Sequence, residues 1–131
     1  MLAVLAAGAL RAEQVVFSEV MYRPAGGKPE FIELWNISHT PLDIARWRFA
    51  RGVDYTFPDF AAGSPQAHIL QAQERVVVSA LDEVSTRAAY PSLPATVRVF
   101  GPWTGALANE GEEVVLEDKN GVVVCTLEDR K

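Results

Sequence analysis

The sequence predicts an antiparallel β-sandwich of eight or nine short strands with one short helix. Short runs of β-branched, aromatic and alternating apolar residues recur along the chain, separated by segments rich in glycine, proline, asparagine and aspartate. The pair Asn120-Gly121 lies between two such runs and is the strongest local signal for a hairpin. With 131 residues, 49% of them apolar and 22% charged, the chain has the size and composition of one globular domain.

Two consecutive runs, 30–36 and 42–49, are expected to form neighbouring strands at the centre of the sandwich, joined by the turn-forming segment 37–41. Successive side chains of a strand point to opposite faces. The apolar side chains that this alternation is expected to turn inward are Ile32, Leu34, Trp47 and Phe49. Trp35 and the arginines of the second run fall on the opposite faces.

The other elements follow from the same criteria. The run 75–79 is almost entirely apolar, which is typical of an inner strand. A helix is expected over 81–90, where Asp82 can cap its start and Pro91 with Pro94 ends it. The single cysteine, Cys125, is expected to be a small buried hydrophobe on a strand. The remaining strands are expected at 15–22, 52–58, 68–70, 97–100, 112–117 and 122–127.

Residues 1–13 differ in composition from the domain, 14–131, that follows them. They contain an apolar run, 2–10, that is too short to cross a bilayer as a helix. Small residues gather at its end, as in the second half of a secretory signal. We expect this segment to be a signal-peptide remnant or, alternatively, an N-terminal arm packed on the domain. The first interpretation predicts a secreted or cell-envelope protein, without a transmembrane segment.

Several motifs resemble, in order and spacing, the lamin tail domain, the immunoglobulin-like domain of nuclear lamins that also occurs in bacterial exported proteins. The matching segments are 19–22, 31–36, 42–47, 55–58 and 107–116. The resemblance implies an immunoglobulin-like sandwich over about 15–126 and a non-catalytic binding or tethering role, often beside other domains of a larger exported protein. One departure is Arg46, which stands where bacterial members often carry glycine before the tryptophan.

No grouping of residues indicates catalysis, a metal or a cofactor. His39 and His68 are isolated from other metal ligands in the sequence. There is no nucleophile elbow, phosphate-binding glycine loop or zinc motif. Glu19, Glu30 and Glu33 would serve acid–base chemistry only at a defined separation, which a sequence does not provide. We therefore expect a protein that is not an enzyme and that has no cofactor.

Five residues match motif positions of the resembled family, which implies structural roles for Glu19, Glu33, Asn36, Trp47 and Asn109. Asn36 and Asn109 flank strands, where a side-chain amide can satisfy backbone groups of a turn. The alternative is a calcium or ligand site built from these side-chain oxygens. The triplet 36–38 also fits an N-glycosylation acceptor.

Two surface features are candidates for binding a ligand or partner. Arg46, Arg48 and Arg51 form a basic strip suited to phosphate, sulfate or carboxylate groups. Trp35 and Trp103, if exposed, would anchor a partner or a sugar ring. The expected function is docking to a protein partner or fused domain. Binding of nucleic acid or acidic polysaccharide by the arginines, or of carbohydrate by the tryptophans, is the alternative, although the net charge of −5 argues against a general nucleic-acid binder.

Overall fold

The computed structural model describes residues 14–60, 67–107 and 113–128, and these residues form nine strands and one α-helix. The helix is α1 (Glu83–Ala89), and a single 3₁₀ turn spans Ala25–Gly27. The strands are β1 (Val15–Met21), β2 (Phe31–Asn36), β3 (Leu42–Asp43), β4 (Arg48–Arg51), β5 (Ile69–Leu70), β6 (Arg75–Ser79), β7 (Arg98–Phe100), β8 (Glu113–Glu117) and β9 (Val123–Glu128). Among the described residues there is no helix with the length and hydropathy needed to span a membrane.

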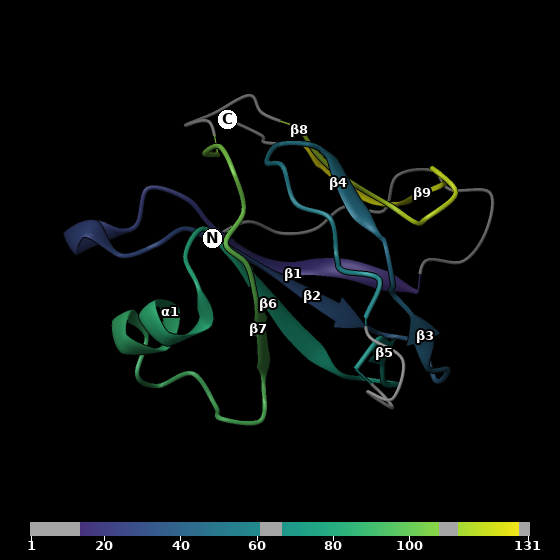
Figure 1. Cartoon of the computed structure of the whole chain (residues 1–131), viewed down its shortest axis with the longest axis horizontal. Helices are drawn as coiled ribbons and strands as arrows, with labels where there is room; N and C mark the ends of the chain where they lie inside the picture. The colour runs from purple at the N-terminus through teal and green to yellow at the C-terminus, as the bar shows by residue number, and fades with distance from the viewer. Residues whose placement is uncertain (1–13, 61–66, 108–112, 129–131) are drawn as a thin grey trace.

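The strands form two facing sheets and a small ribbon (Figure 1). One sheet has the order β1-β2-β6-β7 and the other the order β4-β8-β9, while β3 and β5 pair at one end of the sandwich. Neighbouring strands are antiparallel except β6 and β7, which are parallel. The chain returns between these two strands through α1, and such a crossover is what a parallel pair requires. The predicted sandwich is confirmed, with one parallel pair that the sequence did not predict.

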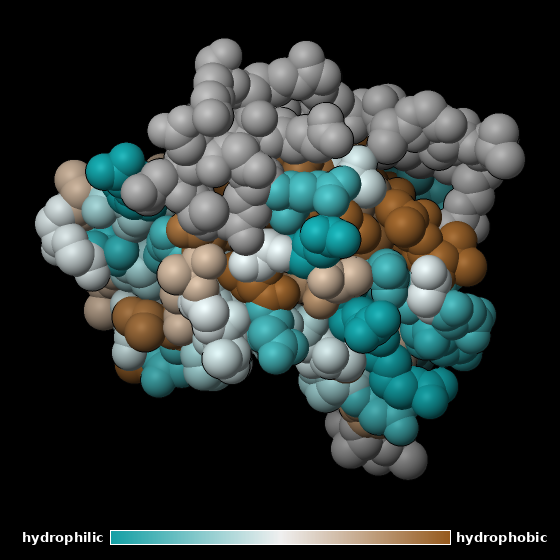
Figure 2. Space-filling view, turned by 90° about the horizontal axis from the view of Figure 1, so that it is seen from above, coloured by the Kyte–Doolittle hydropathy of each residue, from teal (hydrophilic) through white to brown (hydrophobic). Residues whose placement is uncertain are grey.

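The core lies between the two sheets and contains the apolar residues predicted to point inward. Ile32 and Leu34 are fully buried, and Trp47 and Phe49 are 8% and 5% exposed. Cys125 is also buried, as expected. Seen from the top of Figure 1, apolar and hydrophilic residues are intermixed on the surface (Figure 2). Large apolar side chains that remain exposed are scattered over several elements: Ile37, Leu81, Val84, Val122 and Val123.

The segment 42–49 is not one strand, and this part of the prediction was wrong. A turn divides it into β3 and β4, and the backbone N–H of Trp47 donates to the Ile44 carbonyl at 3.1 Å across that turn. Arg46 has a φ of 62°, in the left-handed region. The turn redirects the chain, so β4 joins β8 while β2 lies in the opposite sheet. The two runs face each other across the core instead of lying side by side.

Arg46 occupies a backbone conformation that costs a non-glycine residue about 1–2 kcal/mol. Glycine at this position would avoid that cost. It would also lower the free energy of unfolding by about 0.5–1 kcal/mol, because glycine gives the unfolded chain more backbone freedom to lose on folding. The ion pair from Arg46 Nε to Asp59, 3.4 Å long and exposed, contributes little. We expect Arg46→Gly to raise the free energy of unfolding by about 0.5–1 kcal/mol, measured by urea unfolding. Arg46→Ala is the matched control and is expected to give no gain. Equal stability of the two variants would contradict this account.

The segment 52–58 shows the predicted alternation but does not form a ladder. Val53 and Phe57 are buried and Tyr55 is half-buried, whereas Asp54 and Thr56 are exposed. The segment makes isolated bridges only, from Thr56 to β4 and from Asp54 to the loop after β7. The prediction of its faces is confirmed, but the prediction of a regular strand was wrong.

Two local predictions are confirmed in detail. The Asp82 carboxylate accepts a hydrogen bond from the Ser85 N–H at 2.8 Å and caps the start of α1. In the β8–β9 hairpin, the Asp118 carboxylate accepts from the N–H groups of Asn120 and Val122, and Gly121 takes a φ of 81°. Both features depend on residues close together in the chain.

Candidate functional site

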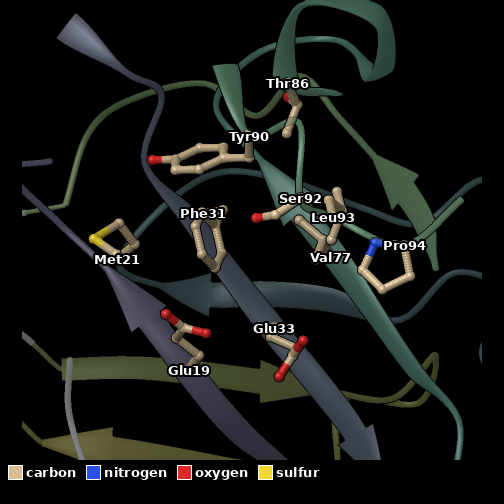
Figure 3. Close-up of a pocket in the computed structure, with 10 residues that line it drawn as sticks. All are labelled: Glu19, Met21, Phe31, Glu33, Val77, Thr86, Tyr90, Ser92, Leu93 and Pro94. Atoms are coloured by element: carbon tan, nitrogen blue, oxygen red, sulfur yellow. The ribbon is translucent and has the colours of Figure 1, made fainter. Parts of the chain in front are cut away.

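The candidate site is a groove of about 290 Å³ on the outer face of the four-stranded sheet, where α1 and the loop after it cover the sheet only in part (Figure 3). Its volume is near the lower end of the roughly 300–1,000 Å³ typical of small-molecule sites, which suits one side chain better than a cofactor. The lining residues are Glu19, Met21, Phe31, Glu33, Val77, Thr86, Tyr90, Ser92, Leu93 and Pro94.

The floor of the groove consists of outward-facing strand positions. Phe31 and Glu33 point outward on β2 because Ile32 and Leu34, their neighbours, are buried in the core. Val77 takes the corresponding position on β6. The residues of the floor are therefore held by the same alternation that forms the core.

Glu19 reaches this face through a β-bulge in β1. The pairing with β2 passes from Phe17 opposite Leu34 to Glu19 opposite Glu33, so Ser18 is an extra residue. Without the bulge, Glu19 would share the inward face of Phe17. Bulges commonly redirect a side chain in this way beside a functional site. Here the bulge places two glutamates directly opposite each other on neighbouring strands.

The wall of the groove is fixed by hydrogen bonds and an aromatic contact. Thr86 donates to the Ser79 hydroxyl at 2.7 Å, which ties α1 to β6. Tyr90 donates its phenolic hydrogen to the Pro29 carbonyl at 2.7 Å, and its ring meets Phe31 edge-on, with centroids 5.2 Å apart. Burial, and next the negative charge of Glu19, raise the pKa of Tyr90, so its hydroxyl remains a neutral donor.

The two carboxylates of the groove have different surroundings. Glu33 accepts a hydrogen bond from the Ser18 hydroxyl at 2.7 Å and lies 3.7 Å from Nε of Arg75. The Arg75 guanidinium also covers the ring of Trp35, 4.0 Å from its centroid. No lysine or arginine in the described part of the chain forms an ion pair with Glu19. The face therefore carries one carboxylate with a cation and one without.

The predicted basic strip is exposed, but each of its arginines faces a carboxylate. The nitrogen–oxygen distances lie between 3.0 and 3.5 Å, and the pairs are Arg46–Asp59, Arg48–Glu117 and Arg51–Glu113. All three arginine side chains remain more than half exposed. The surface around these arginines is consequently one of mixed charge. It belongs to the three-stranded sheet and the β3–β4 turn, whereas the groove lies on the four-stranded sheet.

The two tryptophans proposed as anchors lie in different environments. Trp103 is 5% exposed and belongs to the core, so it does not meet the condition for a sugar or partner anchor. Its loop packs against the end of β6, where the backbone N–H of Trp103 donates a hydrogen bond to the Ser79 carbonyl at 3.0 Å. Trp35 is half-buried under Arg75, further along β2 than the groove.

Asn36 is fully buried at the end of β2 and joins three segments of the chain. Its Nδ2 lies within hydrogen-bonding distance of the carbonyls of Thr40, Leu70 and Gln71, at 2.9–3.0 Å. Its Oδ1 accepts hydrogen bonds from the N–H and the hydroxyl of Ser38. Because the Asn36 Nδ2 is buried and hydrogen-bonded to backbone carbonyls, it is not a glycosylation acceptor in the folded domain.

The structure does not assemble the calcium site considered from the sequence. Asn36 is buried on the core side of β2, whereas Glu33 points to the outer face with Glu19. Asn109 lies outside the described residues. Glu30, which was considered with Glu19 and Glu33 for acid–base chemistry only, does not line the groove, and its carboxylate accepts a hydrogen bond from the Leu107 N–H at 3.0 Å. Within the described ranges, no three His, Cys, Asp or Glu side chains converge as metal ligands.

The sequence did not identify the apolar lining of the groove. The outward position of Phe31 on β2 was a signal, because a large aromatic side chain faced away from the predicted core. The meeting of Phe31 with Tyr90 and Leu93 depends on how α1 and the following loop cross the sheet. Nothing in the local pattern of residues 90–94 predicted that contact.

Comparison with models of known protein families identifies a match. The model of the family described as Lamin Tail Domain matches residues 10–130, which is nearly the whole chain. No curated protein matches the chain at a significant level.

Proposed function

Because the chain belongs to the lamin tail domain family, a non-enzymatic immunoglobulin-like family associated with protein–protein interaction, we propose that it is a docking module of an exported protein. The outer-face groove is the observation that supports this function. Its aromatic and aliphatic floor is bordered by carboxylates and hydroxyls, a mixture that is typical of recognition surfaces. We propose that a segment of a partner protein, or of a domain fused to this one, occupies the groove.

The arrangement of the groove suits binding because its lining is already rigid. The floor belongs to three paired strands, and the hydroxyls of Thr86 and Tyr90 are occupied by Ser79 and Pro29. A preformed surface loses little conformational entropy when a partner arrives. The acceptors of these two bonds are a hydroxyl and a backbone carbonyl, and neither is a base that would activate the donating hydroxyl as a nucleophile.

The alternative functions have less support from the geometry. An anion site on Arg46, Arg48 and Arg51 would have to displace the carboxylate that each arginine already faces. A carbohydrate site would depend on Trp35, because Trp103 is in the core. Export is supported by the apolar run 2–10, which resembles part of a secretory signal.

Docking through the groove is testable in the organism that makes the protein. A photo-crosslinking residue is introduced at Ser92, an exposed lining position, or at Lys119, an exposed control in the β8–β9 turn. We expect a discrete protein adduct from Ser92, recovered from the medium or cell envelope, and none from Lys119. Equal adducts from both positions, or none from Ser92, would contradict docking at the groove. Recovery of the protein from the cytoplasm alone would contradict export.

A further inference from the structure

We infer that the groove receives an arginine side chain of the partner protein, held by the carboxylates of Glu19 and Glu33 and by the rings of Phe31 and Tyr90. This inference rests on the proposed docking function and adds the chemistry of the partner. Three observations carry it: the pairing of the two glutamates, a similar arrangement elsewhere on the same face, and the shape of the groove.

The pairing of the glutamates places two like charges opposite each other, and among the described residues a cation lies beside Glu33 alone. Glu19 and Glu33 are direct partners in the β1–β2 ladder, and both line the groove (Figure 3). Like charges at such positions repel and destabilise a sheet. Arg75 lies beside Glu33 only, and no described cation pairs with Glu19. A cation between the two carboxylates would convert repulsion into attraction at a site that the bulge in β1 creates.

The same sheet face already shows how such a cation would be held. Further along β2, the Arg75 guanidinium stacks over Trp35 and approaches the Glu33 carboxylate. In the groove, Phe31 supplies the aromatic ring and Glu19 lies opposite Glu33, but no arginine among the described residues lines it. A partner arginine would complete a second arrangement of the same kind.

The shape and polarity of the groove favour arginine among cationic side chains. The Phe31 and Tyr90 rings stand nearly perpendicular, at 83°, and offer surface for a flat group. A guanidinium is planar, stacks on aromatic rings, binds carboxylates through two donors and is less strongly hydrated than an ammonium. Met21, Val77 and Leu93 provide apolar surface for the aliphatic part of the side chain.

The two nearby cations in the described part of the chain, Arg87 and Lys28, do not line the groove. Arg87 is engaged by Glu83 at 2.8 Å and by the carbonyls of Pro94 and Val97. The Lys28 ammonium lies 5.3 Å from the centre of the Tyr90 ring, and Lys28 is not a lining residue. Neither side chain forms an ion pair with Glu19 among the described residues.

The probe for this inference is the capped tripeptide Val-Arg-Val, compared with the same peptide carrying citrulline, which keeps the shape of arginine without its charge. Binding is followed by chemical shifts of the isotope-labelled domain. We expect shifts centred on Phe31, Val77 and Leu93, and an affinity about tenfold higher for the arginine peptide, corresponding to one desolvated charge-assisted contact. The preference should weaken as salt is added, because the interaction is electrostatic.

Two variants test the assignment to Glu19. Glu19→Gln should reduce the arginine preference to about threefold or less, while Glu113→Gln, an exchange of the same type on β8, should leave it unchanged. A thermal unfolding midpoint of Glu19→Gln at or above that of the unsubstituted domain establishes that the fold is retained, because the exchange removes one of the two like charges that face each other. Equal affinity for the two peptides, no binding of either, or a preference that survives Glu19→Gln would overturn the arginine site.

The two proposals fail in different ways. If the Ser92 adduct persists but the peptides show no arginine preference, docking stands and the arginine assignment is wrong. If no Ser92 adduct forms in the host, the docking function itself is wrong, whatever the peptides show.

Discussion

Replacing Trp47 by alanine is expected to lower the free energy of unfolding by roughly 3–5 kcal/mol, the range for removing a large aromatic side chain from a core. Trp47 is 8% exposed and lies in the cluster between the two sheets. Its backbone also joins the β3–β4 turn to the segment before Pro58, since the Trp47 carbonyl accepts from the Phe57 N–H at 2.7 Å. Alanine retains that bond but leaves a cavity in place of the indole.

Urea unfolding of the two proteins measures the difference. The matched control is Trp35→Ala, which removes the same side chain from a half-buried position on the outer face. Because Trp35 lies under Arg75 and not between the sheets, we expect a smaller loss, about 1–2 kcal/mol. A loss below about 1 kcal/mol for Trp47→Ala would mean that Trp47 is not central to the core.

Replacing Asn36 by alanine is expected to have an effect of similar size, roughly 3–5 kcal/mol, because each buried polar group left without a partner costs about 1–3 kcal/mol. The Asn36 amide lies against carbonyls from the 37–41 turn and from the end of β5. The Leu70 carbonyl lies in the buried part of this network and would lose that contact. The turn itself would also lose the acceptor for the Ser38 N–H.

Ser38→Ala is the control for Asn36→Ala, because it removes one hydroxyl donor and keeps the amide with its carbonyl contacts. We expect a loss of about 1 kcal/mol from this variant. The measurement is again the free energy of unfolding in urea. If Asn36→Ala and Ser38→Ala are equally stable, the contacts of the Asn36 amide with the carbonyls contribute nothing to the fold.

The parts of the structure that were predictable depend on near neighbours in the chain. The alternation of Ile32 and Leu34 with Phe31 and Glu33 assigned the faces of β2. The pair Asn120-Gly121 located a hairpin, and Asp82 located the start of α1. Strand periodicity, turn conformations and capping bonds involve only a few consecutive residues, so their signals are present in the sequence itself.

The candidate groove was not predictable in the same way. Glu19 was a motif position with an implied structural role, yet its outward direction depends on an extra residue in the ladder with β2. The contact between Phe31 and Tyr90 joins residues that are far apart in the chain. The sequence left open whether Trp103 is exposed, because its loop is rich in glycine and proline; in the structure this loop packs inward and the Trp103 N–H donates to the Ser79 carbonyl.

The amino-acid sequence by itself determined the sandwich class, the apolar side chains around Trp47 that point into the core, and the positions of the hairpin and the helix. Only the tertiary structure decided that 42–49 divides at Arg46, that β7 runs parallel to β6, and that Glu19 faces Glu33 in the groove. The physical reason is the range of the interactions involved. Side-chain periodicity acts over a few residues, whereas register, bulges and the choice of sheet depend on how distant segments pack together.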